Sequence, residues 1–359
     1  MRAFWLVLAG CGRIGFSATA DAPVPFAHVK TITIPHGSVT GGPHASFPLL
    51  IELAADADLA ASARPDGFDI AFTQGATSLA YEREHFDPAT GALVAWVSVP
   101  SLPPDADTTI ELHYGDPDAA DQQAPASVWA SYSGVWHLGD ALADSTSNRN
   151  DATAMNGLAL GAAGVIGGGL HYDGVDDYLD MANSASLDAT ATAATLSAWV
   201  TWDNPAAGHY QFVMSSSNRF VAPGTRDGYE WAVQPDGHYY FYPWGGTETT
   251  FDYANDPFTA GVWHHAVVTM DLATSDVVLY VDGAPVPLLQ DVHNLWTTAA
   301  DPADWLWGGN PLFGGNPAYF AGSMDELRVA TTVRSPGWIA TEYANQRTPA
   351  TFYTVGPER

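Results

Sequence analysis

The segment 144–151 concentrates side chains that could bind a hard metal ion. It reads Asp-Ser-Thr-Ser-Asn-Arg-Asn-Asp, so carboxylate, hydroxyl and amide oxygens follow one another closely. Ca²⁺ takes about 6–8 oxygen ligands of these kinds. The loop therefore predicts a structural calcium site with the following ligands: Asp144, Asn148, Asn150 and Asp151. The alternative is an Asx-rich loop that stabilises itself through hydrogen bonds from side chain to backbone.

An aromatic strand later in the chain is a second candidate site. Neighbouring strand residues point to opposite faces, so Tyr239 and Phe241 share one face of the predicted strand. Tyr240, Tyr242 and Trp244 share the other face. If Tyr239 and Phe241 are buried, the other three rings form a row on which sugar faces could stack, because Tyr and Trp combine an apolar body with a polar tip. The alternative is a strand that is buried on both faces.

Other combinations of reactive side chains predict structural roles. His264 and His265 are adjacent, so a regular strand would point them to opposite faces and they could not bind one ion together. Glu82 and Glu84 lie two apart in a predicted strand, and we expect them on a solvated face. The acidic run 173–177 is expected to cap a tight turn, because Asp side chains readily bond to nearby backbone.

Familiar catalytic motifs are absent from the sequence. It contains no Gly-x-Ser-x-Gly, no His-Glu-x-x-His and no phosphate-binding loop. We therefore expect a protein that binds its ligand and does not catalyse a reaction.

The composition favours a folded all-β protein. The 359 residues include 34 Gly and 25 Pro, which suits many short strands joined by turns. Lys and Arg together number 12 against 40 Asp and Glu, and Lys30 is the only lysine. A net charge of −28 repels phosphate backbones, so we expect no nucleic-acid partner.

Two β domains are predicted, one on each side of a linker at 119–127. Residues 28–118 contain five segments in which apolar and polar residues alternate with period two, as they do in half-buried strands. These segments are 30–34, 47–53, 68–72, 93–99 and 108–114. The linker is polar, contains proline and lacks this period.

Residues 128–357 form the predicted second domain. Its long strands are predicted at 195–202, 263–271, 276–281 and 324–329. Ser335 followed by Pro336 predicts a helix start, since Ser is a favoured N-cap and Pro suits the first helical position. The helix is expected to end near Tyr343, and residues 351–355 are expected to return to the sheet.

Four motifs in the second domain carry a resemblance to a known family. They are Leu-His-Tyr-Asp-Gly-Val-Asp-Asp-Tyr at 170–178, Trp-His-His at 263–265, Tyr-Val-Asp-Gly at 280–283 and Phe-Ala-Gly-Ser-Met-Asp-Glu-Leu-Arg-Val at 320–329. In this order they resemble the laminin G-like jelly roll of the concanavalin A-like lectin and glucanase superfamily.

The first domain also resembles a family, through the segments 96–102 and 110–115. It is similar to a bacterial domain of unknown function that commonly precedes such jelly rolls. The predicted fold is therefore all-β, with a small N-terminal β-sandwich followed by a concanavalin A-like (laminin G-like) jelly-roll sandwich.

The resemblance implies further features of the site. Related jelly rolls bind a structural Ca²⁺ between an early loop and acidic residues near the end of the chain, which adds Asp325 to the predicted calcium ligands. Glycoside hydrolases on this scaffold carry Glu-x-Asp-x-x-Glu on one strand. Lyases on it carry Tyr-x-Lys-Ala-Gly-x-Tyr-x-Gln. This sequence has neither motif.

Cys11 is the only cysteine, and it lies in a lipoprotein signal context. Leu8-Ala9-Gly10-Cys11 matches the lipobox of bacterial lipoproteins and follows a short apolar stretch. The match implies that residues 1–10 are a signal peptide, that Cys11 is lipidated and that residues 11–27 are a tether. The N-terminal lipid would then anchor the protein in the bacterial cell envelope, at the outer membrane or the cell surface. The alternative is a chance match of four residues.

These expectations combine into a non-catalytic, surface-anchored lipoprotein that binds carbohydrate through its second domain. Its partner would be a glycan or another cell-surface ligand. The first alternative is a protein–protein adhesion module that uses the same rim loops. The second is a polysaccharide hydrolase or lyase with an unrecognised site.

We predict that Cys11→Ser moves the protein from the membrane fraction to the soluble fraction of a bacterial host. Several acyl chains bury enough methylene groups to hold a protein at a bilayer. Fractionation and intact-mass analysis of the mature N-terminus measure the effect, and Ser17→Ala in the tether is the matched control. An unmodified Cys11, or unchanged partition of the variant, would refute the anchor.

Overall fold

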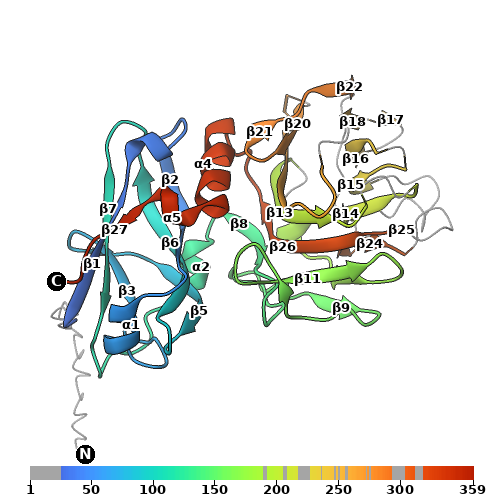
Figure 1. Ribbon diagram of the computed structural model, residues 1–359. Coiled ribbons are helices and arrows are strands. Elements are labelled where there is room, and N and C mark those ends of the chain that lie inside the picture. Colours follow the sequence, from blue (N-terminus) through green and yellow to red (C-terminus); the bar gives the residue numbers. More distant parts are fainter. Residues whose placement is uncertain are drawn as a thin grey trace, which may run out of the picture.

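The computed structural model contains two β-sandwiches that lie side by side, with helix α4 (Pro336–Arg347) between them (Figure 1). It describes residues 26–359 except 189–191, 205–207, 217–226, 236, 246–247, 250, 255–257, 272, 275, 293–303 and 312–317. None of the helices in these ranges has the length and apolar character that crossing a membrane requires. The predicted all-β fold class is confirmed.

The first sandwich packs a five-stranded sheet against a three-stranded sheet. The larger sheet has the order β27-β1-β7-β3-β4, with β27 at Thr354–Val355, β1 at His28–Ile34, β7 at Thr108–Tyr114, β3 at Ala71–Gln74 and β4 at Thr77–Ser78. The smaller sheet has the order β2-β6-β5, with β2 at His44–Leu53, β6 at Ala92–Leu102 and β5 at Tyr81–Asp87. A short turn η1 (His36–Ser38) and helix α1 (Ala57–Ser62) connect strands of this sandwich. Ile32 and Ile34 of β1 are fully buried and Thr33 between them is half-buried, as the period-two pattern predicts.

The second domain is a jelly roll whose first sheet has eight strands. The order is β10-β11-β26-β13-β19-β20-β21, and β8 pairs with β26 outside this path. The strands are β8 (Tyr132–Trp136), β10 (Ala162–Ala163), β11 (Gly168–Asp173), β13 (Ala193–Trp202), β19 (His264–Asp271), β20 (Asp276–Val281), β21 (Ala284–Pro285) and β26 (Ala321–Ala330).

The second sheet of the jelly roll has nine strands. The order is β22-β18-β16-β15-β14-β23-β12-β9, and β17 pairs with β16. The strands are β9 (Thr153–Met155), β12 (Tyr178–Met181), β14 (Gln211–Ser215), β15 (Asp227–Val233), β16 (Tyr239–Gly245), β17 (Glu248–Thr249), β18 (Phe251–Ala254), β22 (Leu288–Val292) and β23 (Trp305–Trp307). Strands β24 (Gly309–Asn310) and β25 (Ala318–Tyr319) form a separate pair, and α3 (Ala185–Asp188) precedes β13.

One apolar core fills the space between the two sheets of the jelly roll. Strand β13 contributes Leu196, Ala198 and Val200 to it, and β16 contributes Tyr239 and Phe241. Both strands present alternate residues to the core, so the period-two reading of these segments is confirmed. The four long strands predicted for this domain are present as β13, β19, β20 and β26.

The end of the chain crosses back from the jelly roll to the first sandwich. As predicted, Ser335 caps α4, and its Oγ accepts a hydrogen bond from the backbone N–H of Trp338 at 3.2 Å. The helix continues to Arg347, beyond the predicted end near Tyr343.

Helix α5 (Pro349–Phe352) and strand β27 (Thr354–Val355) then join the first sandwich. Strand β27 pairs with β1, with Ile32 opposite Val355, so the prediction that residues 351–355 return to the jelly-roll sheet was wrong. The physical reason is burial, since Phe352 and Tyr353 complete the small apolar core of the first sandwich. The predicted domain 128–357 thus contains a C-terminal segment that packs with the preceding domain.

An apolar junction holds the two sandwiches together. Its buried members are Leu50, Val94 and Trp96 from the first sandwich, Val128 and Trp129 at the end of α2 (Pro125–Val128), and Tyr132, Val135, Ile166 and Ala330 from the jelly roll. Helix α4 adds to this junction, because Trp338 packs in the first core while Ile339 packs on Val267 and Tyr280 of the jelly roll.

Asn345 of α4 replaces a missing strand partner at the edge of β2. Its Oδ1 accepts a hydrogen bond from the backbone N–H of Leu50 at 2.8 Å, and its Nδ2 donates one to the carbonyl of the same residue at 3.1 Å.

We predict that Asn345→Ala lowers the free energy of unfolding by about 1–3 kcal/mol, because two buried backbone groups lose their partners. Chemical denaturation measures the change, and Arg347→Ala at the exposed end of the same helix is the control. Equal stability of the two variants would contradict the role of Asn345.

Candidate functional site at the junction of the two domains

A buried polar cluster lies where the two sandwiches meet. Glu82 and Glu84 come from β5 of the first sandwich, His137 directly follows β8, and Glu326 comes from β26. The side chains of His137 and Glu84 are each 11% exposed, and that of Glu326 is 1% exposed. The expectation that Glu82 and Glu84 lie on a solvated face was wrong, because the jelly roll covers them.

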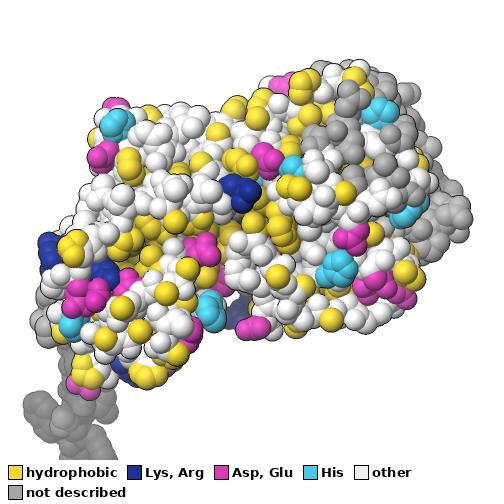
Figure 2. All heavy atoms as spheres, viewed as in Figure 1, with side chains coloured by type: hydrophobic (Ala, Val, Ile, Leu, Met, Phe, Trp, Pro, Cys, Tyr) yellow, Lys and Arg dark blue, Asp and Glu magenta, His cyan; other side chains and the backbone are white. Residues whose placement is uncertain are grey.

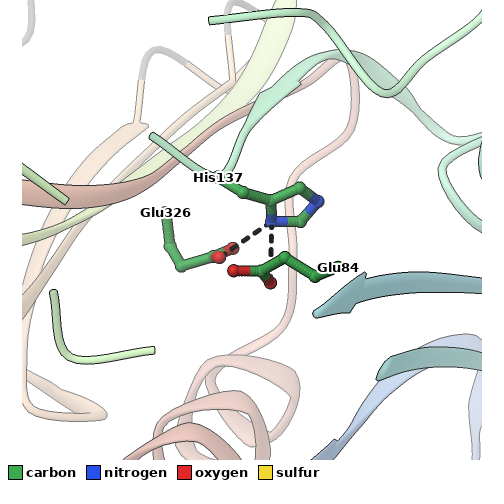
Figure 3. Close-up of side chains that lie close together, drawn as sticks. All are labelled: Glu84, His137 and Glu326. Carbon is green, nitrogen blue, oxygen red and sulfur yellow. Dashed lines mark hydrogen bonds and ion pairs between the residues drawn. The ribbon is translucent and has the colours of Figure 1, made fainter. Parts of the chain in front are cut away.

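His137 is the centre of this cluster, and both of its ring nitrogens face carboxylates. Nδ1 lies 2.8 Å from Oε1 of Glu326 and 3.6 Å from Oε2 of Glu84 (Figure 3). Nε2 lies 3.2 Å from Oε2 of Glu82. Glu326 and His137 belong to the jelly roll and the two other carboxylates to the first sandwich, so the cluster links the domains.

Side chains around the cluster hold each carboxylate in place. Trp96 Nε1 donates a hydrogen bond to Oε2 of Glu84 at 2.9 Å. Oε2 of Glu82 accepts one from Trp129 Nε1, and its Oε1 accepts one from Ser145 Oγ at 2.6 Å. Because buried indole N–H groups are satisfied in this way, the tryptophans of the apolar junction also position the acids.

The backbone of β26 is distorted at the point where it supplies Glu326. Ser197 of β13 pairs with Arg328, but Trp199 pairs with Asp325, so β26 bulges between these pairs. Glu326 has a φ of 51°, in the left-handed region. Such a conformation costs a non-glycine residue on the order of 1 kcal/mol and is often found at functional sites.

Burial and neighbouring charges shift the protonation of the cluster. Burial raises the pKa of Glu84 to about 7, against the attraction of His137 and with added repulsion from Glu326. Burial alone would lower the pKa of His137, but its carboxylate neighbours outweigh burial and raise it well above the usual value. The pKa of Glu326 is lowered in spite of burial, because His137 and Arg328 stabilise its charged form. The cluster therefore combines an acid that is readily protonated with acids that stay ionised.

A cavity of about 750 Å³ opens beside the cluster. Its lining includes Glu82, Glu84, His137, Ser145 and Gly167. Figure 2 shows acidic and histidine side chains beside the hollow where the two halves of the molecule meet.

Glycine forms one wall of this cavity. A Cβ on Gly167, whose φ is +58°, would lie 2.5 Å from Oε1 of Glu84. The absence of a side chain there leaves this oxygen room at the cavity surface.

The acidic side chains of the predicted calcium loop accept hydrogen bonds from the loop itself and from strand β8. Oδ1 of Asp144 accepts hydrogen bonds from the backbone N–H groups of Val135 and Thr146, at 3.1 and 2.9 Å. Its Oδ2 accepts hydrogen bonds from Thr146 Oγ1 and Asn150 N, each at 2.8 Å. Asp151 Oδ1 accepts one from Asp144 N at 2.9 Å. This is the self-stabilised arrangement that the sequence leaves open as the alternative.

The remaining predicted calcium ligands also have partners within the protein. Asn148 and Asn150 each donate through Nδ2 to the carbonyl of Ser133, at 3.1 and 2.8 Å. Asp325 is fully buried, and its Oδ2 accepts hydrogen bonds from the backbone N–H groups of Val165 and Ile166.

Two groups of acidic and histidine side chains within the described ranges bring their donor atoms within 4.8 Å of one another. They are Glu84–His137–Glu326 and Asp173–Asp176–Asp177. Asp144, Asp151 and Asp325 belong to neither group, so a calcium site at the loop stays a prediction. In the second group, Asp173 Oδ1 accepts a hydrogen bond from Val175 N at 2.7 Å, as expected for a tight turn.

The aromatic strand points Tyr239 and Phe241 into the core, but the prediction that Tyr240 offers its ring to a ligand was wrong, because neighbouring side chains bury it. Tyr239 and Phe241 are fully buried in the core of the jelly roll. Tyr240 is on the opposite face, 1% exposed, and Tyr242 is half-buried beside it with a ring distance of 5.0 Å. The side chain of Trp244 lies outside the described residues.

Tyr210, which the sequence does not single out, completes this aromatic group. Its ring lies 6.1 Å from that of Tyr240, and the group also contains Phe212 and Ala232. Trp305 and Trp307 are buried in the core.

Sequence reasoning missed the junction cluster because its residues are distant in the chain. Two signals were present. Asp325, Glu326 and Arg328 are charged residues inside a strand with many apolar residues, and Glu82 and Glu84 share one strand face.

Comparisons with known families agree with the resemblances found in the sequence. Residues 173–340 match the family model of the concanavalin A-like lectin/glucanases superfamily, and residues 66–149 match that of a domain of unknown function (DUF2341). No curated protein matches the chain significantly.

Several solved structures are similar to about 60% of the chain. The receptor-binding domain of botulinum neurotoxin C/D mosaic serotype is 11% identical, with a TM-score of 0.47 over 60% of this chain and 51% of that one. The botulinum neurotoxin serotype D ligand-binding domain in complex with N-acetylneuraminic acid is 12% identical, with a TM-score of 0.47 over 59% of this chain and 50% of that one. Domain 4 of AbnA, an extracellular arabinanase from Geobacillus stearothermophilus in complex with arabinotriose, is 18% identical, with a TM-score of 0.43 over 60% of this chain and 98% of that one. The chain spans about half the length of the neurotoxin domains, and at these scores the likeness says nothing about ligand or activity.

We predict that, with chelator present, the free energy that Glu84 contributes to stability is lost as pH rises from about 4.5 to about 7. Glu84 has an ordinary pKa of 4.5 and a folded pKa of about 7, so the stability it contributes is fully present below pH 4.5 and is lost as pH rises through 7. The pKa of His137 is also raised, so the stability that His137 contributes is lost as pH rises above its ordinary pKa of 6.5.

The variant Glu84→Gln tests this prediction by denaturation at about pH 5 and pH 8. It should be more stable than the wild type at pH 8, by on the order of 1–3 kcal/mol, because it removes a buried ionisation. Glu111→Gln on β7, in the opposite sheet of the first sandwich, is the control and should keep the wild-type pH dependence. A pH dependence of Glu84→Gln that parallels the wild type would contradict the assignment.

Proposed function

Because the chain joins a domain of the DUF2341 family to a concanavalin A-like jelly roll, we propose that it is a binding protein whose jelly roll recognises carbohydrate. The proposal rests on the side chains at the outer face of the nine-stranded sheet. There, aromatic and polar side chains lie next to one another on the face that points away from the core.

Tyrosine rings supply the apolar part of this surface. Tyr210 and Tyr242 are half-buried and pack against the buried Tyr240, which fixes their positions. A sugar ring has apolar C–H faces, and a tyrosine ring offers it a flat apolar surface with a polar hydroxyl at the tip. Positioned rings also lose little conformational entropy when a ligand binds.

Polar side chains on the same face of the sheet are buried beside these rings. Glu230 of β15 lies directly opposite Tyr242 in the sheet, and Ser215 of β14 lies opposite Glu230, so all three point to the outer face. Asn310 Nδ2 donates a hydrogen bond to Ser215 Oγ at 2.8 Å. Because these polar groups are at most 3% exposed, Tyr210 and Tyr242 are the side chains of this group that a sugar could reach.

We propose that the protein binds without cleaving its ligand. A hydrolase or lyase is the alternative, and the carboxylates at the junction cavity are the only described feature that favours it. Each of them is tied to tryptophan, serine, arginine or histidine, which is an arrangement that also serves to join two domains. Release of reducing ends or of unsaturated sugars from a bound polysaccharide would decide for the alternative.

Lipidation at Cys11 remains part of the proposal. Residue 11 lies outside the described residues, so the lipobox motif is its support. An anchor there would hold the binding domain at the cell envelope, where extracellular and envelope glycans are available.

We predict that Tyr210→Ala with Tyr242→Ala lowers polysaccharide affinity by roughly tenfold or more, since each aromatic contact contributes about 0.5–1.5 kcal/mol. A glycan array with the wild-type protein, run with and without Ca²⁺, selects the polysaccharide. Affinity electrophoresis on it then measures the loss.

The control is Phe68→Ala, which removes an exposed aromatic ring of the first sandwich and should leave the affinity unchanged. The melting temperature of the double variant should change little, because both tyrosines reach the surface. Full retention of affinity by the double variant, or a collapse of its stability, would remove this face as the site.

A further inference from the structure

We propose that Glu84, His137 and Glu326 form a binding site for a divalent transition-metal ion such as Zn²⁺ at the junction of the two domains. The site is distinct from the outer face of the nine-stranded sheet and from the predicted calcium loop. Its ligands would come from both domains, so the ion would join the DUF2341 domain to the jelly roll.

The positions of the donor atoms support the proposal. One nitrogen or oxygen from each of the three residues lies within 4.8 Å of the other two. The Nδ1 atom of His137 is 2.8 Å from Glu326 and 3.6 Å from Glu84, and Figure 3 shows both carboxylates on the Nδ1 side of the ring. Ligands of tetrahedral zinc lie about 2.0–2.2 Å from the ion and hence roughly 3.3 Å from one another. The observed separations lie on either side of this value.

The second ring nitrogen of His137 provides an independent indication. Metal-bound histidine almost always donates its other ring N–H to a carboxylate, a carbonyl or a water, which fixes the tautomer. Here Nε2 lies 3.2 Å from Oε2 of Glu82, and Trp129 and Ser145 hold that carboxylate in place. This contact would direct the lone pair of Nδ1 toward Glu84 and Glu326.

The charge of the junction also favours a cation. Arg328 pairs with Glu326 through Nη2 at 2.7 Å and with Glu342 of α4 through Nη1 at 2.8 Å. Glu82 and Glu84 then have only His137 as a cationic partner among the ion pairs of the described residues. Buried carboxylates in excess of buried cations are costly, and a divalent ion would offset the excess.

The chemistry of the ligands and the cavity define the class of ion. One imidazole with two carboxylates suits zinc and its first-row neighbours, whereas calcium prefers oxygen ligands alone. The cavity of about 750 Å³ beside the cluster leaves space for a water or a ligand oxygen at a further position. Three protein ligands with one open position are typical of zinc sites that exchange a ligand.

The experiment uses the full chain after treatment with a chelator and dialysis. Calorimetric titration with Zn²⁺ should show one site per chain, and Zn²⁺ should raise the melting temperature, since an ion that binds only the folded state stabilises it. Co²⁺ replaces Zn²⁺ as a spectroscopic probe and should give visible absorption bands on binding. A junction that is held by ion pairs alone would give neither the heat nor the bands.

The variants assign the ion to these residues. Glu84→Gln keeps an oxygen for the hydrogen bond from Trp96 and should fold, yet it should lower the affinity for Zn²⁺ about a hundredfold. His137→Gln should do the same, and Glu82→Gln, which changes only the residue that positions the ring, should lower it about tenfold. Asp173→Asn in the other acidic group is the matched control and should bind as the wild type does.

Three results would overturn the proposal. The wild type could fail to bind Zn²⁺ or Co²⁺, or Glu84→Gln could bind with wild-type affinity and the same Co²⁺ spectrum. Binding that survives Glu84→Gln but is lost in Asp144→Ala would place the ion at the loop instead.

Circular dichroism confirms that each variant folds. If His137→Gln does not fold, the result for Glu84→Gln decides whether the site exists. Polysaccharide affinity is measured separately, so failure of either proposal leaves the other testable.

Discussion

The arrangement of the two domains depends on the interactions of one buried side chain, the guanidinium of Arg328. It is 1% exposed and bonds Glu326 on its own strand and Glu342 on α4. Its Cζ lies 4.3 Å from the ring centre of Trp96 and 4.8 Å from that of Trp129, so it also makes cation–π contacts to the apolar junction. Removing one partner from such a buried pair costs about 3–5 kcal/mol, because the remaining charge stays buried without compensation. One side chain therefore links the jelly-roll sheet, the C-terminal helix and the first sandwich.

The path of the chain strengthens this link. Helix α4 leaves the jelly roll and packs against both sandwiches, and β27 then adds to β1 at the edge of the first sheet. The first sandwich therefore depends on residues from both ends of the described chain, because part of its core comes from the segment that follows the jelly roll. A covered edge strand is also protected from pairing with other molecules. This connection explains why polar groups at the junction can hold fixed positions, since neither domain is free to move away from the other without breaking apolar contacts.

The two faces of the nine-stranded sheet carry different side chains, because residues alternate along each strand. One face of the nine-stranded sheet supplies Tyr239 and Phe241 to the core, and the other carries Tyr240 and Tyr242. The opposite sheet of the jelly roll is covered by α4 and the first sandwich. Of the two large faces that a sandwich offers, only the outer face of the nine-stranded sheet is therefore not committed to the junction. This geometry places the proposed glycan contacts and the proposed metal site on different sheets.

The sequence by itself determined the all-β class, the two domains, the long strands of the jelly roll and the helix cap at Ser335, because alternation and capping are local properties of neighbouring residues. It also determined which rings of the aromatic strand share a face, although burial was needed to decide which face is inside. Only the tertiary structure decided the placement of β27 and the junction cluster. Glu84, His137 and Glu326 lie in three distant segments, and no local pattern encodes their distances. The protonation of Glu84 was equally beyond the sequence, since its carboxyl loses its hydration only when the jelly roll covers β5.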